Sequence, residues 1–154
     1  MGNFNPQEFA KIKAEAEKFY DSIKTVYCPA LQSEVYFSSE GFSHFQYDGK
    51  RNKRAESVQW LRMKCLEEAV RIIKQTTTVQ EYRVAYQPIG DTYAPGKRLT
   101  KQVIYYGFEA MTDFVQPHRL HIVVRQIENG NFHFWSVRPA MKKDIGRSIW
   151  ILDA

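Results

Sequence analysis

"RLHIVVRQIENGNFHFWSVRP", residues 119–139, contains two runs of alternating side chains on either side of Asn129-Gly130. Asn-Gly is the dipeptide most typical of a two-residue type I′ turn between antiparallel strands. The stretch therefore predicts a hairpin in which Glu128 faces Asn131. The pairs expected further from the turn are Arg125 with Phe134, Val123 with Ser136, and His121 with Arg138.

Strand alternation sorts this hairpin into an apolar face and a mixed face. The apolar face would hold Leu120, Ile122, Val124, Trp135 and Val137, with Gln126 and His133 near the turn. The mixed face would hold His121, Arg125, Ser136 and Arg138, together with Val123, Ile127, Phe132 and Phe134. Burying unpaired charges is costly, so we expect the apolar face to pack under helices and the mixed face to remain available for function. A one-residue slip in register would invert this assignment.

Two segments before the hairpin alternate with the same period of two. They are "VQEYRVAY" at 79–86 and "KQVIYYGFEAM" at 101–111, and each predicts a strand. The segment that separates their cores, "QPIGDTYAPGKRL" at 87–99, is expected to be a mobile loop.

Helical spacing dominates the first half of the chain. Asn5-Pro6 predicts a helix start, and the apolar stripe that follows is Phe9, Ile12, Ala16, Phe19 and Ile23. Residues 58–74 predict a second long helix, with a stripe of Leu61, Cys65, Leu66, Ala69, Val70 and Ile73. Between the two helices, "TVYCPALQSEVYF" at 25–37 predicts a short hairpin.

These elements predict an α+β fold with two main helices packed on a largely antiparallel sheet of about four strands, and a short N-terminal hairpin. We expect residues 1–154 to form one domain. Its predicted parts are an N-terminal helix at 1–25, a motif-bearing core at 26–139 and a C-terminal extension at 140–154.

Composition narrows the class of protein. The 154 residues are 44% hydrophobic, and the formal net charge of +5 favours a polyanionic partner. Cys28 and Cys65 form neither a disulfide framework nor a CxxC pair, which favours a reducing, cytoplasmic setting. Neither a signal peptide nor a membrane span is expected, because every apolar run is short.

His44 is the candidate for proton transfer, in the sequence "EGFSHF" at 40–45 on a short helix capped by Ser38 or Ser39. The basic run that follows offers Lys50, Arg51, Lys53 and Arg54 as candidate phosphate contacts. Each also has a structural interpretation, His44 as a core histidine bonded to a backbone carbonyl and the run as a solvated loop.

Motifs for cofactors and metals are not found. The sequence has no GxxxxGK[ST], GxGxxG or GxSxG pattern. His118 and His121 would project to opposite faces of a strand, and His133 would have no second ligand, so neither a metal nor a cofactor is predicted.

Three quoted segments together resemble a known group of nucleases. "VYFSSEGFSHF", a basic stretch, a helix beginning "WLRMKCLEEA" and the hairpin at 119–139 are similar to the barnase/EndoU/colicin/RelE-like superfamily, especially its phage-associated and toxin-type branch. The resemblance covers residues 26–139. It implies one or two helices on a four-stranded antiparallel sheet, whose opposite face cleaves RNA without a metal.

The resemblance implies a metal-independent endoribonuclease that cleaves tRNA or mRNA through the 2′-hydroxyl, as a toxin or phage-related effector, with an antitoxin or immunity protein as a further partner. Its expected catalytic residues are His44, Arg125 and Ser136. The expected RNA contacts are Lys50, Arg51, Lys53, Arg54, Arg62, Tyr105, His121 and Arg138. Two alternatives stay open: a non-catalytic RNA-binding module and a protein-interaction domain. Arg125 and Arg138 as exposed strand charges, and Ser136 as a structural hydroxyl, fit either alternative.

Overall fold

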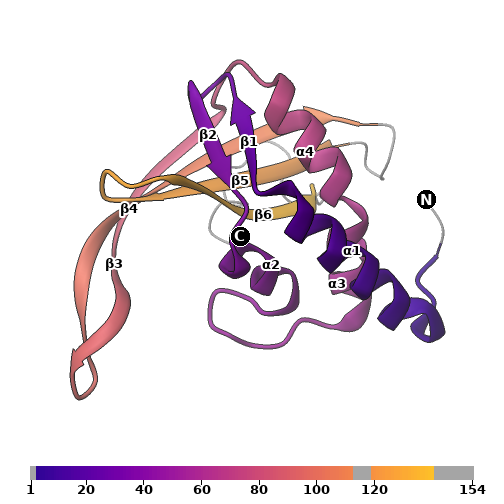
Figure 1. Ribbon diagram of the computed structural model, residues 1–154, viewed down its shortest axis with the longest axis horizontal. Coiled ribbons are helices and arrows are strands. Elements are labelled where there is room, and N and C mark those ends of the chain that lie inside the picture. The colour runs from indigo at the N-terminus through magenta and orange to yellow at the C-terminus, as the bar shows by residue number, and fades with distance from the viewer. Residues whose placement is uncertain (1–2, 113–118, 141–154) are drawn as a thin grey trace.

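The computed structural model describes residues 3–112 and 119–140, and within them the fold is α+β (Figure 1). A 3₁₀ turn, η1 (Pro6–Glu8), leads into α1 (Phe9–Ile23), and the side chain of Asn5 accepts a hydrogen bond from the Gln7 N–H at this start. The remaining helices are α2 (Ser39–Gln46), α3 (Glu56–Lys64) and α4 (Leu66–Gln75). The strands are β1 (Thr25–Cys28), β2 (Ser33–Tyr36), β3 (Glu81–Ala94), β4 (Lys97–Met111), β5 (Arg119–Ile127) and β6 (Phe132–Pro139).

The strands form one six-stranded sheet in the order β1-β2-β6-β5-β4-β3. The expectation of about four strands was too small, because the predicted N-terminal hairpin joins the sheet. Val35 and Tyr36 on β2 pair in parallel with Phe132 and His133 on β6, and every other pairing is antiparallel. The last predicted strands and this short hairpin are thus parts of one sheet.

The second predicted helix is two helices. Cys65 takes φ −86° and ψ −4°, a turn conformation that separates α3 from α4. The predicted stripe is nevertheless buried from Cys65 through Ile73, and only Leu61 is half-buried.

One face of the sheet carries the main hydrophobic core. Tyr20 of α1, Phe45 of α2 and Leu66 of α4 pack there over β5 and β6, together with Phe37, whose ring stacks on Phe134 at 4.9 Å. A smaller cluster around Val103, Tyr105 and Val123 lies apart from this core, and alternation along β5 places it on the opposite face. The helices therefore leave the second face for the candidate site.

A bulge in β6 changes the predicted hairpin. Val123 pairs with Ser136 and His121 with Arg138, as expected, but Val124 pairs with Phe134 and Arg125 with His133. Trp135 is the extra residue, so the predicted pairing of Arg125 with Phe134 was wrong. The bulge sends the rings of Phe132 and Phe134 to the core and that of Trp135 to the opposite face, the reverse of the prediction.

The turn of this hairpin also differs from the predicted Asn129-Gly130 turn. Gly130 donates its N–H to the Ile127 carbonyl at 2.9 Å, so Glu128 and Asn129 are the central residues, and Glu128 takes φ 50°. Glu128 is held there by β4, because its N–H donates to the Gln102 carbonyl at 2.8 Å.

The predicted loop at 87–99 is mostly strand. β3 continues to Ala94 and β4 begins at Lys97, with Gly96 in the turn at φ 70°. Only the stretch of β4 from Val103 to Met111 pairs with β5, so the far end of this hairpin is two-stranded. Figure 1 shows it projecting beyond the other strands.

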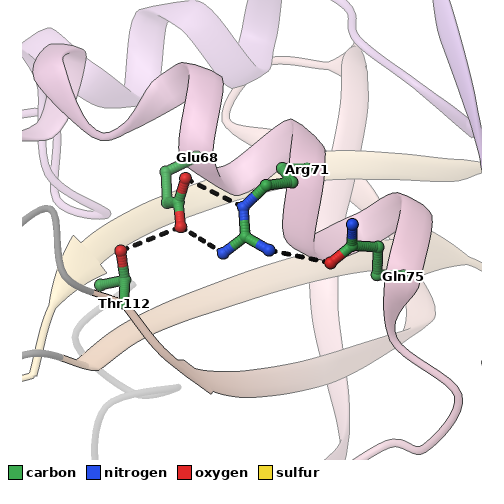
Figure 2. A network of polar contacts seen from close by, with 4 residues as sticks. All are labelled: Glu68, Arg71, Gln75 and Thr112. Carbon is green, nitrogen blue, oxygen red and sulfur yellow. Dashed lines mark hydrogen bonds and ion pairs between the residues drawn. The ribbon is translucent and has the colours of Figure 1, made fainter.

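A polar network ties α4 to the end of β4 (Figure 2). Arg71 pairs with Glu68 through both its Nε and Nη2 atoms and donates from Nη1 to Gln75 Oε1 at 2.8 Å. Thr112 Oγ1 donates to Glu68 Oε1 at 2.9 Å.

Among the described residues, no helix is long and apolar enough to cross a membrane.

Candidate active site

Helix α2 lies against β6, and a glycine permits the close approach. A Cβ atom on Gly41 would lie 2.3 Å from the Tyr20 hydroxyl oxygen and 2.6 Å from the Phe134 carbonyl oxygen. The Tyr20 hydroxyl donates to the Ser38 carbonyl at 2.6 Å, which fixes the start of the helix. Phe42 and Phe45 then enter the main core.

The other side of α2 presents Glu40 and His44, one helical turn apart. His44 is 6% exposed, and its ring stacks on Trp135 with centroids 4.6 Å apart. Arg54, on the loop after α2, contacts both the backbone and the ring of His44. Its Nε donates to the His44 carbonyl at 3.0 Å, and its Nη2 lies 3.5 Å from His44 Nε2.

Arg125, on β5, contacts both Glu40 and Trp135. Its Nη2 donates to Glu40 Oε2 at 2.7 Å, and its Cζ lies 3.7 Å from the centroid of the Trp135 ring. Arg125 is buried, whereas the Glu40 side chain is 72% exposed. The exposed carboxylate therefore meets a guanidinium that is fixed by the sheet and by an aromatic ring.

A cleft of about 890 Å³ opens over these groups. Its walls come from α2, the loop that follows α2, and the β3–β4 hairpin, and its floor is the second face of the sheet. The charged lining residues are Glu40, Asp48, Asp91, Arg51, Arg83, Arg98 and Arg125, beside His44. Tyr47, Tyr105 and Trp135 supply the aromatic part of the lining.

Four of the predicted site residues line this cleft: His44, Arg51, Tyr105 and Arg125. Arg54 is behind His44, in contact with it but outside the lining. Lys50 and Lys53 are exposed on the same loop and do not line the cleft.

The other predicted residues are buried away from the cleft. Ser136 and Arg138 are buried on β6, and Arg62 is buried on α3. His121 is buried on β5, with Nε2 3.5 Å from Glu109 Oε2. These four residues do not line the cleft, so the structure does not bring them together with His44 and Arg125 there.

Burial and neighbouring charges lower the pKa of two basic side chains near the candidate site. Burial lowers the pKa of Arg54, and the neighbouring Arg138 lowers it further, against the opposing effect of Asp48. Burial, followed by Arg125, lowers the pKa of His133, which pairs with Arg125 across the strands.

The turn after α2 is shaped by Asp48. Its Oδ1 accepts the backbone N–H groups of Lys50 and Asn52 at 2.8 and 2.9 Å. The Asn52 N–H above all lowers the pKa of Asp48. This carboxylate is thereby committed to the loop that carries Arg51.

Several residues that line the cleft were not predicted, among them Glu40, Trp135 and Arg83. Glu40 precedes His44 by four residues, a spacing that places both on one helix face and was visible in the sequence. Trp135 was assigned to the core, and only the bulge brings its ring under His44 and Arg125.

The described residues contain no group of three or more His, Cys, Asp or Glu side chains that could hold a metal ion. His118, considered above for such a pair, lies outside the described residues, as do residues 141–154 of the predicted C-terminal extension.

Comparison with family models, curated proteins and solved structures found no match to this chain.

Proposed function

We propose that this protein is a metal-independent endoribonuclease that cleaves RNA by attack of a 2′-hydroxyl on the adjacent phosphodiester, and that it acts as a toxin or phage-related effector. The observation that carries the proposal is the meeting of Glu40, His44 and Arg125 in one cleft. The reaction requires a base, an acid and positive charge at the phosphorane, and a carboxylate, an imidazole and a guanidinium can fill these three roles.

The two proton transfers are assigned to α2. The Glu40 carboxylate, which pairs with Arg125, is assigned the removal of the proton from the 2′-hydroxyl. His44 in its protonated form then donates a proton to the departing 5′-oxygen. Their positions four residues apart allow both to face one phosphate in the cleft.

The arginines are assigned the stabilisation of negative charge on the pentacoordinate phosphorane. Arg125, whose Nη2 donates to Glu40, brings a permanent positive charge beside that carboxylate. Arg51 lines the wall that the loop after α2 forms. Arg54 acts through His44, whose carbonyl it holds. Ser136 does not line the cleft, and we assign it no direct contact with the phosphate.

The test uses an oligodeoxynucleotide that contains one ribonucleotide, in buffer with EDTA. We expect the wild-type protein to cut this strand only at the ribonucleotide and to leave a 2′,3′-cyclic phosphate. Cleavage of the all-deoxy strand at an equal rate would contradict the proposal, because that strand lacks the attacking hydroxyl. Absence of cleavage in every RNA tested, with tight RNA binding retained, would favour a non-catalytic RNA-binding module.

A further inference from the structure

Three side chains form a row across the sheet, at the floor and wall of the cleft. Arg83 on β3 pairs with Tyr105 on β4, and Tyr105 pairs with Arg125 on β5. Residues paired across strands point to the same face, and all three line the cleft. Because neighbouring strands are about 4.8 Å apart, the two arginines start roughly 10 Å apart on either side of Tyr105.

The two arginines of this row differ in their partners. Arg125 already holds Glu40. Arg83 is half-buried on the cleft wall and, within the described part of the chain, forms no ion pair with a carboxylate. A half-buried guanidinium that faces a cleft and forms no ion pair is suited to bind an anion from solution.

The residues around Arg83 extend the same surface along the hairpin. Gln87 Oε1 accepts a hydrogen bond from the Tyr105 hydroxyl at 2.9 Å, and this bond fixes the phenol ring between the two arginines. Arg98, on the other strand of the hairpin, also lines the cleft. A nucleic-acid strand with one phosphate at Arg125 therefore meets further positive charge at Arg83 on β3 and at Arg98 on β4.

We infer that Arg83 forms a second phosphate subsite, and that the substrate is single-stranded RNA that runs from Arg125 across Tyr105 to Arg83. This inference rests on the proposed function, because it takes Arg125 as the position of the scissile phosphate. It adds the substrate class and a binding residue outside the reacting groups.

Burial of the reacting groups favours a single strand. His44 is 6% exposed at the bottom of the cleft, so the scissile phosphate must descend to it. A double helix holds its backbone on a rigid, convex surface, whereas a single strand can bend into a cleft and place its bases beside aromatic rings. The β3–β4 hairpin, which projects beyond the other strands (Figure 1), lines one side of the cleft, and we expect it to obstruct a duplex and to offer a wall to a single strand.

The experiment measures binding to a fluorescent single-stranded oligonucleotide whose 2′-hydroxyls are all methylated, which prevents cleavage. Fluorescence anisotropy is recorded over a range of salt concentrations for the wild type, Arg83→Gln, Arg83→Lys and Lys74→Gln. Lys74 is exposed on α4, on the helix-covered side of the sheet, and provides the matched control. Circular dichroism and melting curves establish that all four proteins fold alike.

We expect Arg83→Gln to weaken binding and to reduce the slope of log K against log salt by about 0.7, the value for one phosphate contact on a single strand. Arg83→Lys should keep the wild-type slope, and Lys74→Gln should match the wild type throughout. The same oligonucleotide in a duplex should bind more weakly, with no effect of Arg83→Gln. Wild-type affinity and slope in Arg83→Gln, or a preference of the wild type for the duplex, would overturn the inference.

Cleavage of unmodified RNA separates the two proposals. If Arg83→Gln raises KM and leaves kcat near the wild-type value, both stand. Arg83-dependent binding by a wild type that cuts no RNA would sink the proposed function and leave the subsite. Cleavage with the same KM in Arg83→Gln would remove the subsite and leave the nuclease.

Discussion

The ring of His44 stacks on the ring of Trp135, with centroids 4.6 Å apart and planes inclined by 28°. This contact joins α2 to β6 on the face of the sheet opposite the main core. Arg125 lies against the same indole, so one aromatic ring positions the proton-transfer group and the guanidinium together. The account makes Trp135 a positioning residue, which supports the reacting groups without taking part in proton transfer.

Replacement of Trp135 tests this role. Trp135→Leu removes the aromatic face under Arg125, a contact of the kind that contributes about 0.5–2 kcal/mol. We expect RNA cleavage to fall by roughly 2- to 30-fold, the same free energy expressed as a rate. Trp135→Phe, which keeps an aromatic face, should lose less. Equal losses in the two variants, measured as kcat/KM, would contradict a role for the ring.

Gly41→Ala is predicted to destabilise the fold. The new methyl group would meet the Tyr20 hydroxyl and the Phe134 carbonyl at distances well inside van der Waals contact. Overpacking costs about 1–3 kcal/mol, and contacts this short place Gly41→Ala toward the upper end, above the roughly 1 kcal/mol that alanine gains over glycine in a helix. Urea unfolding would measure the loss, with Ser39→Ala on the exposed side of α2 as the control. A Gly41→Ala protein as stable as the wild type would mean that α2 does not approach β6 as described.

His133 is predicted to make stability depend on pH. Burial, followed by Arg125, lowers its pKa in the folded state from the usual value of 6.5. The unfolded chain therefore binds more protons than the folded chain just below that pH. The free energy of unfolding should be greatest above about pH 6.5 and should fall as the pH is lowered through the folded-state pKa.

The measurement for His133 compares urea unfolding of the wild type and His133→Gln at several pH values. The difference between the two proteins should change between neutral and mildly acidic pH, with the wild type losing relatively more stability. Parallel profiles would show that His133 has the same pKa in the folded and unfolded states.

The two cysteines are predicted to be chemically inert in the folded protein. Burial raises the pKa of Cys65 to about 12 and also raises that of Cys28. The thiolate is the reactive form, so a thiol reagent at pH 8 should modify neither residue until the protein unfolds. Denaturant should then release both thiols. Rapid modification of the native protein would show that one of these sites opens readily.

Local sequence patterns predicted most of the elements and part of the site. Alternation along β5 placed His121 and Arg125 on one face, and the pairing of Val123 with Ser136 was confirmed. A cap at Ser38 or Ser39 predicted the short helix that carries His44. These features depend on neighbouring residues, whose periodicity the sequence shows directly.

Features that depend on distant partners were missed. The position of Trp135 follows from one extra residue in β6, and no local pattern distinguishes such a bulge from regular alternation. The parallel pairing of Val35 with Phe132, which enlarges the sheet, joins residues far apart in the chain. The same holds for Arg83, which became a candidate only when strand register placed it in line with Arg125.

The most direct test of the account is the rate of RNA cleavage in EDTA by the wild type, His44→Ala, His44→Gln and Lys74→Gln, after matched circular dichroism and melting curves. We predict that the wild type and Lys74→Gln cut at the same rate, and that both His44 variants are slower by about 100- to 10,000-fold, the usual contribution of a positioned proton-transfer group. Cleavage by a folded His44 variant at the wild-type rate would contradict the central claim that the cleft beneath α2 is a nuclease active site.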